Sequence, residues 1–340
     1  MSLVIHAPNV HQGGGRTLLL ALLQAAGPGT RAILDERLEL PNSVTQSLAI
    51  TRVAPTLLAR FKSEWQLGAM LGAADTVLSF GNLPPLFSTR ARVVLFLQNR
   101  HLVSATDTAG FPLHVRLRIV MERVWLRWRL SAISLLVVQT PSMQREVEQI
   151  LGMKAQVMPF VASSRGYTRR PSANIDAPAH YDFIYVASSD PHKNHLNLLD
   201  AWILLAQENI YPSLCLTLAT GEGSDLKRRI AAAMELHSVR IQCRGDLRYE
   251  DMQTLYRQSR ALIYPSMVES FGLPLIEARC AGLAILAAER DYVRDVVDPE
   301  ETFDPESPVS IARAVKRFLG LPEAPLSLTG AAEFLRALDA

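Results

Sequence analysis

Short runs rich in Val, Ile and Leu alternate with longer helical patterns along the chain, and this alternation strongly constrains its fold. Strand-like runs are predicted at Leu3–His6, Thr76–Phe80, Val93–Leu97, Leu135–Gln139, Gln156–Phe160, Phe183–Ala187, Leu214–Ala219, Val239–Cys243, Ala261–Tyr264 and Ala284–Ala287. Helical patterns such as Leu57–Leu71, Leu196–Gln207 and Leu226–Leu236 fill the gaps. Buried strands separated by helices predict an α/β fold with parallel sheets that are covered on both faces.

The length of 340 residues exceeds what one ordinary hydrophobic core organises, so we expect two domains. The polar stretch 161–180, which carries Pro and Arg residues, is the predicted linker. We therefore predict two doubly wound, Rossmann-like domains that face each other across a cleft, at residues 1–165 and 166–322. Residues 323–340 are predicted to be a C-terminal helical segment that packs back on the N-terminal domain.

Charge is divided unevenly between the two halves. Residues 1–165 contain 17 Lys and Arg against 9 Asp and Glu, a net charge of +8, whereas the remainder has a net charge of −6. A basic first half indicates contact with something anionic. Nucleic acid is not the predicted partner, because no nucleic-acid-binding motif accompanies the Arg residues. No apolar run reaches the roughly 20 residues of a membrane-spanning helix, so we expect a cytoplasmic protein.

Three loops between a strand-like run and a helical pattern are candidates for binding phosphate or a nucleobase. Gly13–Gly15 leave bare backbone amides at a helix start, where a phosphate can approach. Lys193 follows a strand and opens a helix, where its point charge can meet a phosphate. Gly221 and Gly223 form a tight turn that a flat base or a phosphate can approach. A plain turn for the glycines and a solvated lysine remain alternative interpretations.

The stretch 264–282 (YPSMVESFGLPLIEARCAG) contains two glutamates that a packing motif does not need. Pro274 suits the first helical position, and the amides of Phe271 and Gly272 at the helix start suit an anion. Glu277, one turn into the helix, can accept two hydrogen bonds from a ribose diol. Glu269, ahead of the turn, can favour a transition state with oxocarbenium character. An ordinary helix start would explain Glu277 but not Glu269.

With these motifs the chain resembles the retaining GT-B glycosyltransferases of family 4 over nearly its whole length. The most specific match is Glu269-Ser-Phe-Gly-Leu-Pro-Leu-Ile-Glu277, which fits the E-x7-E motif of that family. Further matches are Gly221-Glu222-Gly223, Lys193 in "HKN", Gly13–Gly15 and "FDPESPVSIARAV" near the end. The resemblance implies that Glu277 holds the nucleotide ribose, that Glu269 contacts the donor sugar, and that Lys193 and the glycine amides neutralise the diphosphate. It also implies catalysis without a metal or other cofactor.

Two positions depart from the family pattern. Ala187-Ser188 stand where the family carries Gly-Arg, so one expected phosphate cation is missing. Gln98-Asn99 stand where the family tends to carry His-Asp. We expect Gln98 to bond the donor sugar and Arg100 to replace the lost cation, whereas the alternative is a polar loop without a catalytic part.

The predicted site therefore has two groups of residues. Glu269 and Lys193 are the predicted catalytic residues. The predicted donor-binding residues are Gly14, Gly15, Gln98, Asn99, Arg100, Gly221, Gly223, Phe271, Gly272, Leu273 and Glu277.

The basic segment 113–133 (LHVRLRIVMERVWLRWRLSAI) bears on the acceptor. Helical spacing places Arg116, Arg123 and Arg127 beside an apolar face that holds Leu117, Val120, Val124 and Trp128. Such a helix can lie on an anionic bilayer, and the alternative is a core helix with an arginine-rich solvent face.

The resulting hypothesis is a retaining, metal-independent hexosyltransferase that uses a nucleotide-diphosphate sugar, with GDP-mannose preferred. The expected acceptor is a glycan or a polyprenyl-linked oligosaccharide in cell-surface polysaccharide or lipopolysaccharide synthesis, at the inner membrane face. Two alternatives stay open. One is another GT-B enzyme, either a sugar-phosphate synthase or a nucleotide-sugar epimerase. The other is a catalytically inert subunit that binds a nucleotide sugar for a partner enzyme.

Overall fold

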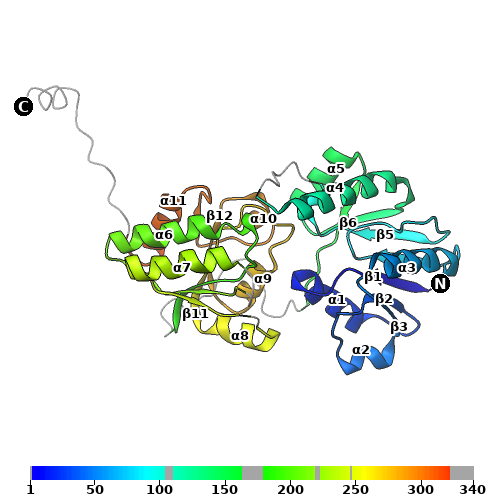
Figure 1. Cartoon of the computed structure of the whole chain (residues 1–340), viewed down its shortest axis with the longest axis horizontal. Helices are drawn as coiled ribbons and strands as arrows, with labels where there is room; N and C mark the ends of the chain where they lie inside the picture. The colour runs from blue at the N-terminus through cyan, green and yellow to red at the C-terminus, as the bar shows by residue number, and fades with distance from the viewer. Residues whose placement is uncertain (1, 104–109, 163–178, 219–222, 246, 322–340) are drawn as a thin grey trace, which may run out of the picture.

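A computed structural model describes residues 2–103, 110–162, 179–218, 223–245 and 247–321, and in it two parallel-sheet domains lie side by side (Figure 1). The strands of the N-terminal domain are β1 (Leu3–Ala7), β2 (Arg31–Asp35), β3 (Ala49–Val53), β4 (Thr76–Ser79), β5 (Arg92–Phe96), β6 (Leu135–Val138) and β7 (Ala155–Val157). Its α-helices are α1 (Gly13–Ala25), α2 (Asn42–Ser47), α3 (Leu57–Met70), α4 (Leu113–Trp128) and α5 (Pro141–Leu151), with 3-10 turns η1 (Arg100–Leu102) and η2 (Leu130–Ala132).

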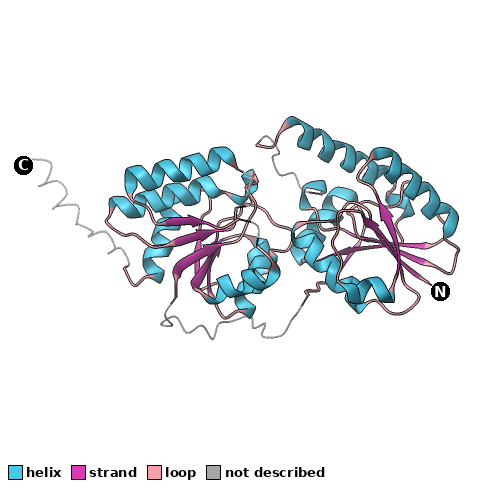
Figure 2. Ribbon diagram, turned by 60° about the horizontal axis from the view of Figure 1, so that its bottom comes forward, coloured by secondary structure: helices cyan, strands magenta, loops and turns pink. Residues whose placement is uncertain are grey.

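The C-terminal domain repeats the alternation. Its strands are β8 (Tyr181–Tyr185), β9 (Leu214–Leu216), β10 (Ile241–Cys243), β11 (Ser259–Tyr264), β12 (Ala284–Ala288) and β13 (Glu301–Phe303). Its helices are α6 (His195–Gln207), α7 (Ser224–His237), α8 (Tyr249–Arg257), α9 (Leu273–Cys280), α10 (Asp291–Arg294) and α11 (Pro308–Phe318), with the 3-10 turn η3 (Pro191–Lys193). Helices cover both faces of each sheet (Figure 2), so the predicted α/β class with two Rossmann-like domains is confirmed.

Strand order fixes where a ligand can bind. The N-terminal sheet has the order β3-β2-β1-β4-β5-β6-β7 and the C-terminal sheet the order β10-β9-β8-β11-β12-β13, with every pairing parallel. The order therefore reverses direction between β1 and β4 in the first sheet and between β8 and β11 in the second. Doubly wound sheets bind ligands in the crevice at the carboxyl ends of such neighbouring strands. In Figure 1 the starts of α1 and α9 face each other between the domains.

Three strands were not predicted from the sequence, and each omission has a physical reason. β2 has charged residues at both ends, so its apolar run is three residues long. β3 and β13 lie at sheet edges, where a strand has a neighbouring strand on one side alone. In β3 the pattern is mostly exposed, and β13 has three residues. A search for continuous apolar runs misses edge strands of this kind.

The hydrophobic cores differ between the domains. One continuous cluster fills the C-terminal domain on both faces of its sheet, with Trp202, Tyr185, Tyr256 and Tyr264 almost completely buried. The N-terminal domain divides its buried residues among three smaller clusters. The predicted domain boundary at residue 165 and the segment 323–340 lie outside the described residues, so both stay predictions.

Candidate active site

Lys193 and Glu269 meet at the switch point of the C-terminal sheet, one after β8 and the other after β11. The Lys193 Nζ lies 2.7 Å from the Glu269 Oε1, and these side chains are 15% and 12% exposed. The Tyr264 hydroxyl donates to the same oxygen at 2.9 Å. Burial raises the pKa of the Glu269 carboxyl, but the charge and hydrogen bond of Lys193 outweigh burial and hold that pKa below its ordinary value. Glu269 is therefore an anion at neutral pH.

Helix α9 carries the second glutamate and begins at a backbone turn that requires glycine. Gly272 precedes the helix with φ +74°, and a Cβ there would lie 2.9 Å from the Leu275 Cδ1. Leu273 is the first helical residue, so Pro274 takes the second position and not the expected first. Glu277 accepts a hydrogen bond from the Tyr256 hydroxyl of α8 at 3.0 Å, and burial raises its pKa.

The N-terminal domain contributes the start of α1. The helix begins at Gly13, its first turn has no acidic residue, and Gln12 provides no side-chain cap for the amides. A Cβ at Gly14 would lie 3.0 Å from the Leu273 Cδ1, so glycine lets this helix approach α9 of the other domain. Bare amides and the positive end of the helix dipole suit an anion here.

These elements enclose one pocket of about 530 Å³ between the domains. Its lining includes the following predicted residues: Gly14, Gly15, Gln98, Lys193, Glu269, Phe271, Gly272, Leu273 and Glu277. The pocket is therefore built from both domains and unites most of the predicted site. Apolar side chains of Val186, Leu247 and Met252 line it too, where the flat face of a base can pack.

Arg16 lines the same pocket, and sequence reasoning missed it. It stands in the first turn of α1, where a cation opposes the helix dipole unless an anion is bound nearby. Within the described part of the chain Arg16 has no ion-pair partner. A cation that directly follows three glycines at a helix start was the available signal. Ser188, which takes the place of the family's arginine, lines the pocket as well.

Gln98 is held in place by residues that the sequence did not single out. Asn82, which has φ +70°, accepts hydrogen bonds from the backbone N–H groups of Gln98 and Asn99 at 2.6 and 2.8 Å. The Gln98 Nε2 donates to the Phe80 carbonyl at 3.1 Å. The Asn99 side chain accepts from the His101 N–H at 3.1 Å. Asn82 thus shapes the loop that the family fills with His-Asp.

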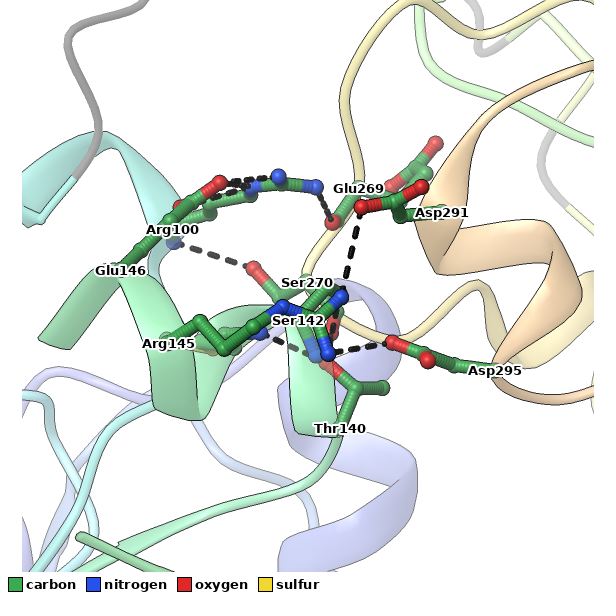
Figure 3. Close-up of polar contacts among 10 residues, drawn as sticks. Arg100, Thr140, Ser142, Arg145, Glu146, Glu269, Ser270, Asp291 and Asp295 are labelled. Atoms are coloured by element: carbon green, nitrogen blue, oxygen red, sulfur yellow. Dashed lines mark hydrogen bonds and ion pairs between the residues drawn. The ribbon is translucent and has the colours of Figure 1, made fainter. Parts of the chain in front are cut away.

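Arg100 lies outside the 530 Å³ pocket, in which it was predicted to bind the diphosphate. Its guanidinium binds Glu146 of α5 through Nε and Nη2 and donates to the Glu269 carbonyl at 3.1 Å (Figure 3). It is absent from the lining of the 530 Å³ pocket, where Lys193 and Arg16 lie. A carboxylate partner holds Arg100 outside this pocket, and its role as a replacement for the lost phosphate cation stays a prediction.

Gly221 and Gly223, which were predicted to form a tight turn, differ in what the structure shows of them. Gly223 precedes α7 with φ +59°, and a Cβ there would lie 2.8 Å from the Ser189 Cβ. It packs against the loop that carries Lys193 and does not line the pocket. Gly221 lies outside the described residues, so its role stays a prediction.

A second pocket of about 430 Å³ adjoins the first. Gly15, Gln98, Glu269 and Ser270 line both, so Glu269 stands at their border. Most of the other lining residues are polar or basic, among them Asn9, His11, Asn99, Arg100, His101, Arg118 and His192. Burial and the charge of Lys193 lower the pKa of His192 to about 4, and burial and Arg123 lower that of His101. Both imidazoles are therefore neutral at neutral pH and can bond uncharged hydroxyl groups.

No cluster of three or more His, Cys, Asp or Glu side chains with the arrangement of a metal site occurs among the described residues.

Known proteins resemble this chain in sequence and in fold. Residues 174–333 match the sequence profile of the family described as Glycosyl transferases group 1. The serotype-specific mannosyltransferase WbdA of Escherichia coli is 31% identical over 143 residues, which are 42% of this chain and 17% of WbdA. The O-antigen chain mannosyltransferase B of Escherichia coli is 29% identical over 116 residues, which are 34% of this chain and 30% of that protein. The chain thus spans at most 30% of these two relatives.

The likeness in fold extends over both domains. The crystal structure of Anabaena Alr3699/HepE in complex with UDP matches with a TM-score of 0.69 at 16% identity, covering 94% of this chain and 90% of that one. Two Rossmann-like domains with a pocket between them give the chain the GT-B architecture. More particularly, residues 174–333, just under half of the chain, are similar to the glycosyl transferases group 1 family.

Proposed function

We propose that this chain is a retaining glycosyltransferase that moves a sugar from a nucleotide-diphosphate donor to a glycan or lipid-linked acceptor in cell-surface polysaccharide synthesis. The observation that carries the proposal is the ionised Glu269 at the border of two pockets, paired with Lys193. The larger pocket would hold the donor and the smaller one the acceptor. The reacting sugar carbon would then lie beside Glu269.

The donor would be bound by different groups along its length. Glu277 would accept hydrogen bonds from the ribose diol, with Tyr256 fixing one carboxylate oxygen. The diphosphate would lie between the amides of Gly13–Gly15, the Arg16 guanidinium and the Lys193 ammonium group. Two cations and a helix start can neutralise a diphosphate, so we propose a mechanism without a metal. Activity that disappears with EDTA and returns with manganese would contradict this part.

The chemistry needs stabilisation of positive charge on the sugar. As the bond from the anomeric carbon to the diphosphate oxygen breaks, the Glu269 carboxylate would favour the oxocarbenium-like transition state. The acceptor hydroxyl would attack from the same face and pass its proton to a phosphate oxygen of the leaving group. This route gives retention of configuration without a separate base, and Lys193 would stabilise the negative charge that develops on the diphosphate.

The donor is proposed to be GDP-mannose, in line with the mannosyltransferases among the relatives. Thermal-shift titration with GDP, UDP, dTDP and ADP tests the base. The cognate nucleotide at 100 times its dissociation constant should add about 2.7 kcal/mol to the free energy of unfolding. A larger shift with UDP than with GDP would contradict the choice of donor while leaving the reaction class intact.

Peripheral binding to an anionic membrane is proposed from the outer surface of α3 and α4. On α3 the exposed side chains include Leu57, Leu58, Phe61 and Trp65, whereas Ser63 and Glu64 are buried. On α4 they include Leu117, Val120, Val124 and Trp128, each between 54% and 68% exposed. The charges of Arg60 on α3 and Arg118 on α4 both lower the pKa of Glu122, so the two helices lie within electrostatic range of each other. No helix in the described part of the chain is long and apolar enough to span a bilayer.

The exposure of these faces argues against the alternative that 113–133 is a core helix with a polar solvent face. Ile119 and Leu126 are the residues of α4 that are buried, and Arg116 and Arg127 are exposed beside the apolar face. Arg123 differs from the sequence expectation, because its Nε donates to the His101 carbonyl at 2.9 Å. Exposed arginines next to apolar side chains favour anionic lipid, and Arg118 connects α4 to the smaller pocket.

Turnover of the donor distinguishes this proposal from an inert binding subunit. Wild-type protein with GDP-mannose and a polyprenyl-linked oligosaccharide should release GDP, and the new glycosidic bond should keep the α configuration of the donor by proton NMR. Glu269→Gln should bind GDP but release it from GDP-mannose more slowly by a factor on the order of 100 or more. Nucleotide binding by the wild type without any turnover of GDP-, UDP-, dTDP- or ADP-sugars would favour the inert subunit.

A further inference from the structure

The N-terminal domain holds the backbone of the segment that carries Glu269. The Arg100 backbone N–H donates to the Ser270 Oγ at 3.0 Å, and the Arg100 Nη1 donates to the Glu269 carbonyl at 3.1 Å. The Thr140 Oγ1 donates to the Ser270 carbonyl at 3.3 Å. Figure 3 shows these contacts crossing between the domains at one point. The backbone on the carboxyl side of Glu269 is thus fixed by a domain other than its own.

Arg100 is itself held rigidly. Its Nε lies 2.9 Å from each carboxylate oxygen of Glu146, and its Nη2 donates to the Glu146 Oε1 as well. The side chains of this pair are 16% and 24% exposed, so water screens the pair only in part. A planar guanidinium that binds a carboxylate with two nitrogens has one orientation, and Nη1 is left to bind the Glu269 carbonyl.

Helix α5, which carries Glu146, is docked on the C-terminal domain at its first turn. The Ser142 N–H donates to the Asp295 Oδ2 at 3.0 Å, so a carboxylate from the other domain caps this helix start. Arg145 of the same turn reaches Asp291 at 3.3 Å, but that pair is 62% and 76% exposed. An exposed pair of this kind contributes little. Of the part-buried contacts between the domains, those of Arg100 and Thr140 reach Glu269 or Ser270, and that of Ser142 reaches Asp295.

We propose that Arg100 is a positioning residue that places the Glu269 carboxylate for catalysis only when the two domains are docked. Lys193 and Tyr264 hold the carboxylate from the donor domain, whereas Arg100 holds the adjoining backbone from the acceptor domain. Separation of the domains removes the second hold and leaves the turn before α9 free to move. This inference rests on the proposed function for its kinetic part, and it makes donor chemistry depend on the acceptor domain.

The experiment compares Arg100→Gln with the matched control Arg145→Gln, which removes an arginine that also crosses the interface but does not contact Glu269 or Ser270. Steady-state transfer, calorimetric affinity for the cognate nucleoside diphosphate and hydrogen exchange of the peptide covering residues 266–273 are measured. Arg100→Gln should lower kcat at least tenfold, leave nucleotide affinity within twofold and speed exchange of that peptide at least tenfold. Arg145→Gln should change each quantity less than twofold.

Three further variants make the test independent of any folding defect in Arg100→Gln. Glu146→Gln frees the guanidinium and should lower kcat in the same way, and the double variant should be no worse than Arg100→Gln alone. Arg100→Lys cannot bind both partners and should recover less than half of the lost kcat. Unchanged exchange and kcat in Arg100→Gln would overturn the positioning role, and so would additive effects of the two single variants.

The exchange measurement also separates this inference from the proposed function. If the wild type turns over no nucleotide sugar, the proposed function fails, and faster exchange of residues 266–273 in Arg100→Gln still supports the positioning contact. If the wild type is active and exchange is equal in all variants, the positioning contact fails while the proposed function stands.

Discussion

The two domains contribute to one pocket by different physical means. The C-terminal domain contributes the Lys193–Glu269 ion pair and the Glu277 carboxyl group, and buried tyrosines bind both glutamates beside one continuous core. The N-terminal domain contributes backbone amides at the start of α1 and exposes the apolar faces of α3 and α4. A nucleotide has the same charges in every turnover and suits a rigid set of side chains. The lipid-linked acceptor that we propose would suit an open surface next to the pocket.

Breaking the ion pair of the C-terminal domain should have the largest effect. Lys193→Met leaves the Glu269 carboxylate buried without its cation, so the free energy of unfolding should fall by about 3–5 kcal/mol at pH 8. The control is Lys154→Met, which removes an exposed lysine and should change stability by less than about 0.5 kcal/mol. Urea unfolding measures both.

The contribution of Glu269 to the free energy of unfolding should depend on pH in opposite ways in the wild type and in Lys193→Met. In the wild type the pKa of Glu269 is lowered on folding, so its stabilising contribution is present above the ordinary value of about 4.3 and is lost below it. In Lys193→Met burial alone raises the pKa, so the carboxyl is best tolerated when protonated. The stability difference between variant and wild type should therefore grow from pH 5 to pH 8, and a constant difference would contradict the buried-pair account.

Glu277→Ala should separate nucleotide binding from chemistry on the same helix. Loss of hydrogen bonds between a charged carboxylate and the ribose should weaken binding of the cognate nucleoside diphosphate by about 1.5–3 kcal/mol. Calorimetry of the diphosphate and of its 2′,3′-dideoxy analogue provides the contrast, because the analogue should bind both proteins equally weakly. Equal losses for both ligands would remove Glu277 from the ribose site.

Arg16→Gln tests whether the N-terminal domain supplies the phosphate cation that position 188 lacks. Affinity for the nucleoside diphosphate should fall about tenfold, which is 1.4 kcal/mol, while affinity for the nucleoside stays constant. Arg90→Gln, an exposed arginine of the same domain, is the control. Adding Ser188→Arg to Arg16→Gln should restore the affinity for the nucleoside diphosphate. If Arg16→Gln alone leaves this affinity unchanged and the double variant does not raise it, Arg16 does not supply the missing phosphate cation.

The smallest effects are expected at the membrane surface. Arg116→Gln and Arg127→Gln should each weaken binding to vesicles rich in phosphatidylglycerol by about 1 kcal/mol. Replacing the exposed Leu117 by Ser should weaken binding too, whereas Leu236→Ser on α7, at a position that is 75% exposed against 55% for Leu117, should not. Equal vesicle binding in all four variants and the wild type would exclude α4 as the contact.

The donor side could be predicted from the sequence because its residues are local. Glu269 and Glu277 belong to one strand–turn–helix unit, and the turn at Gly272 follows from a backbone that only glycine adopts easily. Lys193 follows β8, the neighbour of β11 in the sheet, so parallel topology brings it to the same edge. The glycine turn and the alternation of strands and helices, both of which can be recognised in the sequence, set these positions.

The acceptor side could not be predicted in the same way. Arg100 meets Glu146, 46 residues away, and Ser142 meets Asp295 at a separation of 153, distances that no local pattern encodes. The pattern of α4 indicated an apolar face, but a pattern cannot tell whether another element covers that face. Asn82 gave a weak signal, a residue that tolerates positive φ directly after a glycine beyond a strand. Contacts between residues far apart in the sequence fix the positions of Arg100 and Ser142.

Glu269→Gln tests the central claim most directly, because it keeps the shape of the side chain and removes the charge at the border of the two pockets. The steady-state turnover of GDP-mannose and the calorimetric affinity for GDP are measured on this variant and on the wild type. We predict a turnover rate lower by a factor on the order of 100 or more with GDP affinity nearly unchanged, because charge matters where the transition state develops it. Full turnover in Glu269→Gln would contradict the proposed glycosyl transfer mechanism.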